Sequence, residues 1–245
     1  MAKTLILGAT SAIAIETAKI LSDRGDALFL VARSPEKLES VRCDLEVRGG
    51  KIAGTLSSDL NDFSTHPGLM KKALEALQGL DLVLIAHGTL GDQKACEQDF
   101  VLAEKEIRTN FLSCVSLLTL ISNKMEQEKS GTIAVISSVA GDRGRQSNYI
   151  YGSAKGALNL FLQGLRNRMY SSGVMVLTIK PGFVDTPMTA ALKKNFLFAK
   201  PDQIGRGIVK AIDRKKDVVY LPCFWWGIMA IIKAIPEKIF KRLKL

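Results

Sequence analysis

The chain has 245 residues, of which 47% are hydrophobic and 24% charged, so its composition excludes a disordered chain and fits one globular domain. Its formal net charge is +10, yet it has no zinc-finger spacing, aromatic RNA-binding motif or block of lysines and arginines, and we expect no nucleic-acid ligand. The four cysteines are widely spaced, which predicts no metal site, no disulfide framework and a cytoplasmic protein. The apolar part of the N-terminus is too short for a signal peptide.

Short apolar runs alternate with helical patterns along the whole chain. The predicted strands cover residues 4–7, 27–32, 51–57, 80–86, 131–137, 174–180 and 218–221. One predicted helix follows the first strand, and others cover 36–48, 65–77, 99–125, 149–170 and 202–215. This alternation predicts a single Rossmann-type α/β domain, with a doubly wound, mostly parallel sheet of seven strands and helices on both faces. We place a dinucleotide-binding and catalytic domain at 1–221 and an apolar, basic C-terminal extension at 222–245.

The first predicted strand leads into a turn of small residues and then into a helix. Backbone N–H groups in such a turn can reach a pyrophosphate at the positive end of the helix dipole, because no bulky side chain stands in the way. The candidate cofactor-binding residues of this turn are Gly8, Thr10, Ser11 and Ile13. The alternative is a tight turn that binds no ligand.

The second and third strands also end at candidate cofactor contacts. An acidic residue after the second strand would bind a ribose diol, whereas an arginine binds a 2′-phosphate. Arg33 stands there and favours NADP(H), with NAD(H) not excluded; a solvated arginine at a helix start is the alternative. Asp59 places a carboxylate at the carboxyl end of the third strand, where ligands bind in open α/β sheets.

Two polar residues stand out in the middle of the chain. His87 follows the fourth strand but has no partner cysteine, serine or acid at motif spacing, so we interpret it as a cofactor-side or packing residue. Asn110 lies in an apolar stretch of the predicted helix 99–125, against local propensity. That position indicates a buried polar role for Asn110, and an exposed asparagine is the alternative.

Ser138 follows the fifth strand, and the next helix carries Tyr151 and Lys155. A spacing of four residues stacks the last two on one helix face. An ammonium group beside a phenol favours the phenolate, so it lowers the pKa of the tyrosine and makes it a usable general acid or base near neutrality. The Ser138 hydroxyl can bind a substrate carbonyl oxygen. Taken alone, the Tyr–Lys spacing also fits an ordinary exposed helical pair.

Together, in this order and spacing, these motifs resemble the short-chain dehydrogenase/reductase family over nearly the whole chain. The resemblance implies a catalytic set of Ser138, Tyr151, Lys155 and Asn110, in which Tyr151 exchanges the proton and Asn110 supports a water-mediated relay to Lys155. It implies an adenine contact at Asp59. It implies further cofactor contacts at Ala86, Gly88, Tyr151, Lys155, Pro181, Gly182, Val184 and Thr186. The implied activity is NADPH-dependent reduction of a ketone by a homodimer or homotetramer.

Two motifs depart from the family pattern. The family's Gly-x-x-x-Gly-x-Gly reads Gly8-x-x-x-Ala12-x-Ala14 in this chain, and its Asn-Asn-Ala-Gly reads Ile85-Ala86-His87-Gly88. Two added methyl groups near the pyrophosphate put the cofactor affinity in question. They motivate the alternative of a non-catalytic dinucleotide-binding or membrane-associated module.

The last part of the chain combines an apolar run with basic residues. The uncharged run 218–232 is shorter than the roughly 20 residues that a spanning helix needs. Lysines and arginines alternate with apolar residues after it, and Trp225 and Trp226 lie near its start. This pattern fits an interfacial segment on an anionic leaflet at the inner face of the membrane. Packing on the core or on another subunit is the alternative.

The tail also narrows the resemblance. Its Tyr220-Leu221-Pro222 and Ile235-Pro236, with the runs 88–92 and 140–145, are similar to the decaprenylphosphoryl-2-keto-erythropentose reductases. That similarity implies a lipid-linked keto-sugar substrate, whose phosphate Arg143 and Arg145 can meet unless they form a solvated loop. A reductase of soluble ketones or 3-oxoacyl substrates is the alternative.

Overall fold

A computed structural model of the chain describes residues 1–190 and 192–243. Its centre is one sheet of seven strands in the order β3-β2-β1-β4-β5-β6-β7, and every pair is parallel. The strands are β1 (Lys3–Leu7), β2 (Ala27–Ala32), β3 (Lys51–Ser57), β4 (Leu82–Ile85), β5 (Thr132–Ile136), β6 (Met175–Pro181) and β7 (Val218–Leu221). The predicted doubly wound α/β fold is therefore confirmed.

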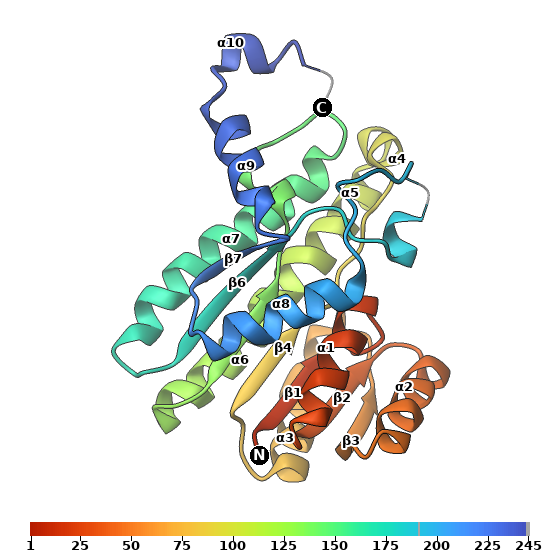
Figure 1. Cartoon of the computed structure of the whole chain (residues 1–245), viewed down its shortest axis with the longest axis vertical. Coiled ribbons are helices and arrows are strands. Elements are labelled where there is room, and N and C mark those ends of the chain that lie inside the picture. The colour runs from red at the N-terminus through yellow and green to blue at the C-terminus, as the bar shows by residue number, and fades with distance from the viewer. Residues whose placement is uncertain (191, 244–245) are drawn as a thin grey trace.

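Helices cover both faces of this sheet (Figure 1). One face carries α1 (Ala12–Asp23), α2 (Pro35–Val47) and α8 (Pro201–Asp213), and the other carries α3 (His66–Leu77), α6 (Ser113–Glu128) and α7 (Tyr149–Tyr170). Strand residues alternate between the two cores: Leu5 and Leu7 pack toward α3, α6 and α7, and Ile6 packs toward α1 and α8. Burial on both faces explains why the strands read as continuous apolar runs.

The strand order places a topological switch point at one end of the sheet. From β1 the chain runs outward to β2 and β3 and then returns to β4 on the other side of β1. The turns that leave β1 and β4 therefore diverge at the carboxyl ends of two neighbouring strands. Open α/β sheets bind ligands at such a switch point.

The predicted helix 99–125 is wrong in its detail. A separate short helix, α4 (Gln93–Gln98), precedes it, and the rest divides into α5 (Phe100–Ile107), a π-helical turn η2 (Arg108–Leu112) and α6. Within η2 the Asn110 side chain donates to the carbonyl oxygen of Glu106 at 3.1 Å, and the Ser113 N–H donates to the carbonyl oxygen of Arg108. A side chain that takes up a helical carbonyl opens the backbone ladder, and this competition explains the π turn.

The C-terminal segment forms α9 (Phe224–Ala234) and α10 (Glu237–Phe240). Figure 1 shows both at the end of the molecule toward which the strands point. Trp225 and Met229 are buried in a small core with Val139, whereas Trp226 and Ile231 are 66% and 70% exposed. The segment thus packs on the domain by one face and leaves an apolar face outside. Within residues 1–190 and 192–243, no helix has the length and apolar character needed to cross a membrane.

Candidate active site

The turn after β1 has the shape that an anion-binding turn requires. Gly8 has a φ of 86°, and a Cβ there would lie 2.6 Å from the backbone nitrogen of His87, so only glycine fits between the ends of β1 and β4. Ser11 precedes α1 without a side-chain cap, and the first N–H groups of a helix have no intrahelical partner. Thr10 and Ile13 flank this helix start. The predicted pyrophosphate residues therefore lie together at an open helix N-terminus.

Ala12 and Ala14, which replace two glycines of the family pattern, have different surroundings. The Ala14 side chain is 0% exposed and packs in the core under α8, so its methyl group points away from the turn. Close helix–sheet packing is the role of the third glycine in this motif. Ala12 begins α1 and is partly exposed. Ala12 is therefore the position at which an added methyl group bears on the cofactor.

Arg33 and Asp59 lie beyond the carboxyl ends of the neighbouring strands β2 and β3. The Arg33 side chain is exposed, and its backbone carbonyl accepts from the Ser57 hydroxyl at 3.0 Å. Asp59 is also exposed and accepts from the Asn61 N–H at 3.0 Å. Both side chains are thus available at the same edge of the sheet as Gly8.

Asn110, Gly88 and Lys155 converge from three separate elements. Asn110 is 0% exposed; its Oδ1 accepts from the Thr89 N–H at 3.2 Å, and its Nδ2 donates to the Thr89 carbonyl at 3.1 Å. A Cβ at Gly88 would lie 2.7 Å from Asn110 Oδ1 and 3.4 Å from Lys155 Nζ. Because Gly88, two residues after Ala86, has no side chain, the Asn110 amide and the Lys155 ammonium group can both lie close to its backbone.

Glu106 is a buried carboxylate that the sequence analysis missed. Its side chain accepts from the Thr89 hydroxyl at 2.8 Å, the Gly91 N–H at 3.0 Å and Asn110 Nδ2 at 3.2 Å. Through these bonds the Glu106 carboxylate, one helical turn before Asn110, fixes the position of the Asn110 side chain. Glu106 is four residues before Asn110 and therefore lies on the same helix face. This spacing is the sequence signal that could have predicted their contact.

Tyr151 and Lys155 lie one turn apart on α7, as their spacing predicts. Lys155 is 3% exposed; its Nζ donates to the Ile136 carbonyl at 3.3 Å and lies 5.8 Å from the centre of the Tyr151 ring. Ser138 is 9% exposed and follows β5. Its hydroxyl oxygen accepts from the Ala140 N–H at 3.0 Å and so caps the short helix η3 (Val139–Asp142).

His87 packs beside this group without facing outward. The Ser113 hydroxyl donates to the Thr109 carbonyl at 2.8 Å, so the contact of 2.6 Å between His87 Nε2 and Ser113 Oγ has the imidazole as donor. Burial, together with the Lys155 charge, lowers the pKa of His87 to about 3. A neutral imidazole that packs against α6 agrees with the predicted packing role.

The turn after β6 is closed by the C-terminal segment. A Cβ at Gly182 would lie 1.9 Å from Trp225 Nε1, so the indole covers the position next to Pro181. Val184 forms a β-bridge with Ala199, and the Thr186 N–H donates to Thr189 Oγ1 at 3.2 Å. Four of the predicted cofactor contacts, Pro181, Gly182, Val184 and Thr186, thus lie on one loop that these contacts fix.

Arg143 and Arg145 do different things in the structure. The Arg143 guanidinium donates to the carbonyls of Ile232 at 2.7 Å and Ile235 at 2.6 Å, and it lies 3.7 Å from the Phe240 ring centre. Arg143 therefore holds the C-terminal segment, and neither the predicted phosphate contact nor a solvated loop describes it. Among residues 1–190 and 192–243, the buried Arg145 Nε finds no hydrogen-bond partner, and burial lowers the pKa of Arg145.

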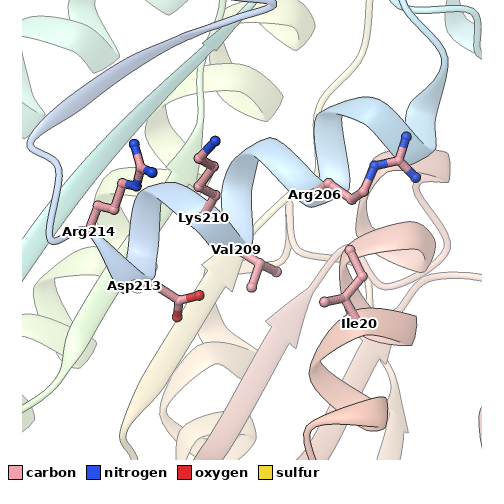
Figure 2. A pocket seen from close by; sticks show the side chains of 6 residues that line it. All are labelled: Ile20, Arg206, Val209, Lys210, Asp213 and Arg214. Carbon is pink, nitrogen blue, oxygen red and sulfur yellow. The ribbon is translucent and has the colours of Figure 1, made fainter.

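Two surface pockets lie outside the predicted catalytic set. Figure 2 shows the first, of about 440 Å³, between α1 and α8. Its walls are Ile20, Arg206, Val209, Lys210, Asp213 and Arg214. The second, of about 490 Å³, lies between residues 196–199, the start of α8 and the start of α9. Neither is lined by Ser138, Tyr151 or Lys155.

Comparisons with known proteins agree with this architecture. Residues 2–196 match the family described as short chain dehydrogenase. An uncharacterized oxidoreductase of Mycobacterium tuberculosis is 31% identical, with 99% of this chain and 97% of that protein covered. An uncharacterized oxidoreductase of Streptomyces coelicolor is 33% identical, with 98% and 94% covered. Among solved structures, an actinorhodin polyketide ketoreductase with NADPH has a TM-score of 0.82 at 18% identity, covering 91% of this chain and 97% of that one.

The fold, the family match and the full-length relatives define the class of the protein. The chain belongs to the short-chain dehydrogenase/reductase family and is a short-chain oxidoreductase. Membership supports a nicotinamide dinucleotide as its cofactor. The fit is good where the structure tests it, because the turn from Gly8 to Ser11 holds only small residues and Ser11 makes no side-chain cap at the N-terminus of α1.

Proposed function

We propose that the chain is an NADPH-dependent carbonyl reductase that converts a ketone to an alcohol with Tyr151 as the proton donor. The observation that carries this proposal is the burial of Lys155. Lys155 is 3% exposed, and within residues 1–190 and 192–243 its ammonium group donates to a backbone carbonyl and forms no ion pair with a carboxylate. A buried ammonium group that no acid neutralises is costly for folding. A chemical task beside Tyr151 accounts for its retention.

The proposed proton chemistry uses groups that are already held in place. Ser138 donates a hydrogen bond to the ketone oxygen, and Tyr151 transfers its phenolic proton to that oxygen as it becomes an alkoxide. The positive charge of Lys155 stabilises the phenolate that Tyr151 leaves behind. Asn110 supports the water-mediated relay that returns a proton from solvent to Lys155. The bound cofactor supplies the hydride.

Arg33 supports NADPH over NADH. It is exposed directly after β2, at the position where an arginine accommodates a ribose 2′-phosphate. The cofactor contacts that we propose are the same residues that the sequence indicates, from Gly8 to Thr186. Ala12 is the position at which we expect this cofactor to fit less closely than in relatives with glycine there.

We further propose that the ketone is lipid-linked and that the protein docks on an anionic membrane. The support is a set of exposed large apolar side chains in two stretches, 193–196 and 224–243, that also carry basic residues. Its apolar members are Phe196, Phe224, Trp226, Ile231, Ile239 and Leu243, and its basic members are Lys193, Lys194, Lys233, Lys238, Lys241 and Arg242. This composition matches an anionic leaflet. Arg145, with its unpaired buried Nε, is the residue that we assign to a substrate phosphate.

A second apolar surface supports a homodimer or homotetramer. Phe100, Val101 and Leu112 on the α5–α6 helix and Leu160 on α7 are between 41% and 75% exposed. Exposed large side chains that gather on two adjacent helices mark an interaction surface. The partner that we propose is a second copy of this chain.

The proposed function is tested by two measurements on the whole chain. Tryptophan fluorescence follows the titration with NADPH and NADH, and absorbance follows NADPH consumption with phenanthrenequinone, a reactive diketone. Tyr151→Phe is expected to lower turnover by roughly 10²–10⁴-fold, because the proton donor is lost, while the dissociation constant of NADPH changes little. Tyr149→Phe on the same helix is the matched control. NADPH binding with equal turnover in both variants would contradict the role of Tyr151.

The two alternatives give different results in the same experiment. A reductase of soluble ketones or 3-oxoacyl substrates shows Tyr151-dependent turnover without binding to anionic vesicles. A non-catalytic dinucleotide-binding module binds NADPH and shows no turnover with any ketone.

A further inference from the structure

Asp142 lies at the centre of a buried polar network that the proposed chemistry does not use. It is the last residue of η3, four residues after Ser138. Its Oδ1 accepts from Lys180 Nζ at 2.6 Å, and its Oδ2 accepts from the Tyr220 hydroxyl at 2.6 Å. The Asp142 and Lys180 side chains are 4% and 10% exposed. The carboxylate therefore joins η3 to the ends of β6 and β7.

The same network reaches the helix that carries Lys155. Asn159, one turn beyond Lys155, donates from Nδ2 to Asp142 Oδ1 at 3.5 Å. Its Oδ1 accepts from the Ser137 hydroxyl at 2.7 Å. A Cβ at Gly141 would lie 2.6 Å from the Lys155 carbonyl carbon, so η3 rests directly on this turn of α7. Ser138 is thus held from both sides, by Ser137 before it and by Asp142 after it.

The partners of Asp142 connect the segments that must be in register for hydride transfer. Lys180 immediately precedes Pro181 and Gly182, which begin the loop of proposed cofactor contacts. The Asp142–Lys180 ion pair fixes the separation between that loop and the segment of Ser138. A buried ion pair adds little stability relative to apolar residues of the same volume, so stability alone does not account for its retention.

We propose that Asp142 is a positioning residue: through Lys180 and Asn159 its carboxylate sets the position of Ser138 relative to the Pro181-Gly182 loop and the Lys155 turn. This inference rests on the proposed reductase function. It assigns Asp142 no contact with substrate or cofactor. Loss of the network loosens the geometry of the reacting groups, and a displacement of about 1 Å in such groups can lower the rate by about 10²-fold.

The test separates positioning from stability with an apolar replacement of the network. Asp142→Asn alone leaves a buried ammonium group without its partner and lowers the midpoint of thermal unfolding. The triple variant Asp142→Leu, Lys180→Met, Tyr220→Phe removes every polar group of the ion pair and restores that midpoint. Arg168→Met with Glu126→Leu removes an exposed ion pair between α7 and α6 and serves as the control.

Two readouts decide the outcome in the triple variant. The proposal expects kcat with NADPH and phenanthrenequinone to fall at least about 10-fold with KM for NADPH nearly unchanged, and amide hydrogen exchange to rise in η3 and in residues 182–184. A restored midpoint with wild-type kcat and wild-type exchange overturns it. If the wild-type chain reduces no probe ketone, the reductase proposal fails and the exchange measurement alone decides the positioning role.

Discussion

His87 makes the stability of the fold depend on pH in a direction that can be worked out from its surroundings. Its imidazole is buried beside Lys155, and its pKa falls from 6.5 to about 3. The unfolded chain therefore binds a proton between pH 6.5 and about 3 that the folded chain does not bind. Stability rises with pH wherever the unfolded state binds more protons, so acidification through this window destabilises the fold.

The magnitude follows from the two pKa values. One pKa unit corresponds to about 1.4 kcal/mol, and at pH 5 the medium is 1.5 units below the unfolded value. Wild-type protein is expected to lose about 2 kcal/mol of unfolding free energy through His87 between pH 7.5 and pH 5. For a chain of this size that loss lowers the midpoint of thermal unfolding by roughly 4–8 °C.

The assay is urea unfolding followed by tryptophan fluorescence at both pH values. His87→Gln keeps an N–H donor for Ser113 but does not titrate, so it is expected to lose about 2 kcal/mol less than the wild type on acidification. Carboxylates contribute equally to both proteins and cancel in this difference. Burial also lowers the pKa of His66, the other histidine, so His66 contributes an acid loss of the same sign to both proteins and cancels in the same difference. An equal acid loss in wild type and His87→Gln would refute the reasoning.

Three further predictions concern the turn after β1, the cofactor preference and the membrane surface. Gly8→Ala is expected to destabilise the fold by more than Gly25→Ala, because both glycines have positive φ but a Cβ at Gly25 meets nothing within 4 Å, so the control carries only the backbone penalty of about 1–2 kcal/mol. An equal loss of unfolding free energy in the two variants, measured by urea unfolding, would exclude a steric clash between a Cβ at position 8 and the end of β4. Arg33→Ala is expected to raise the dissociation constant of NADPH at least about 10-fold and that of NADH little, as measured by fluorescence titration; equal effects would make Arg33 a surface residue only. Trp226→Ser with Ile231→Ser is expected to weaken sedimentation with anionic vesicles by at least about 10-fold while thermal stability is unchanged, since both side chains are mostly exposed. No binding of the wild type to such vesicles would end the membrane proposal.

The C-terminal segment contributes buried side chains to the domain, so point substitutions on its exposed face are a cleaner test of membrane binding than truncation. Trp225, Met229 and Phe240 are buried, and Arg143 bonds the carbonyls at the end of α9. Truncation after Leu221 would therefore remove part of the core together with the exposed surface. Packing on the core, one of the two predicted alternatives, accounts for one side of α9, and the membrane proposal concerns the exposed side.

The features that could be predicted without the structure are those that depend on local spacing. The alternation of apolar runs and helical patterns indicated seven strands in one doubly wound sheet, because each element must bury a face and parallel strands need crossovers. The spacing of Tyr151 and Lys155 placed them on one helix face for the same local reason. The turn at Gly8 was recognisable because small residues follow a strand and precede a helix.

The pairing of groups that are distant in sequence could be seen only once the packed elements were known. Arg143 finds its partners 89 and 92 residues away, and Asp142 bonds Lys180 across 38 residues. The π turn at Asn110 depends on Thr89 and Glu106 as much as on its own helix. Such contacts depend on how whole elements pack, because a buried polar group must find its partner wherever the fold brings one. The local sequence pattern therefore does not predict which distant groups will pair.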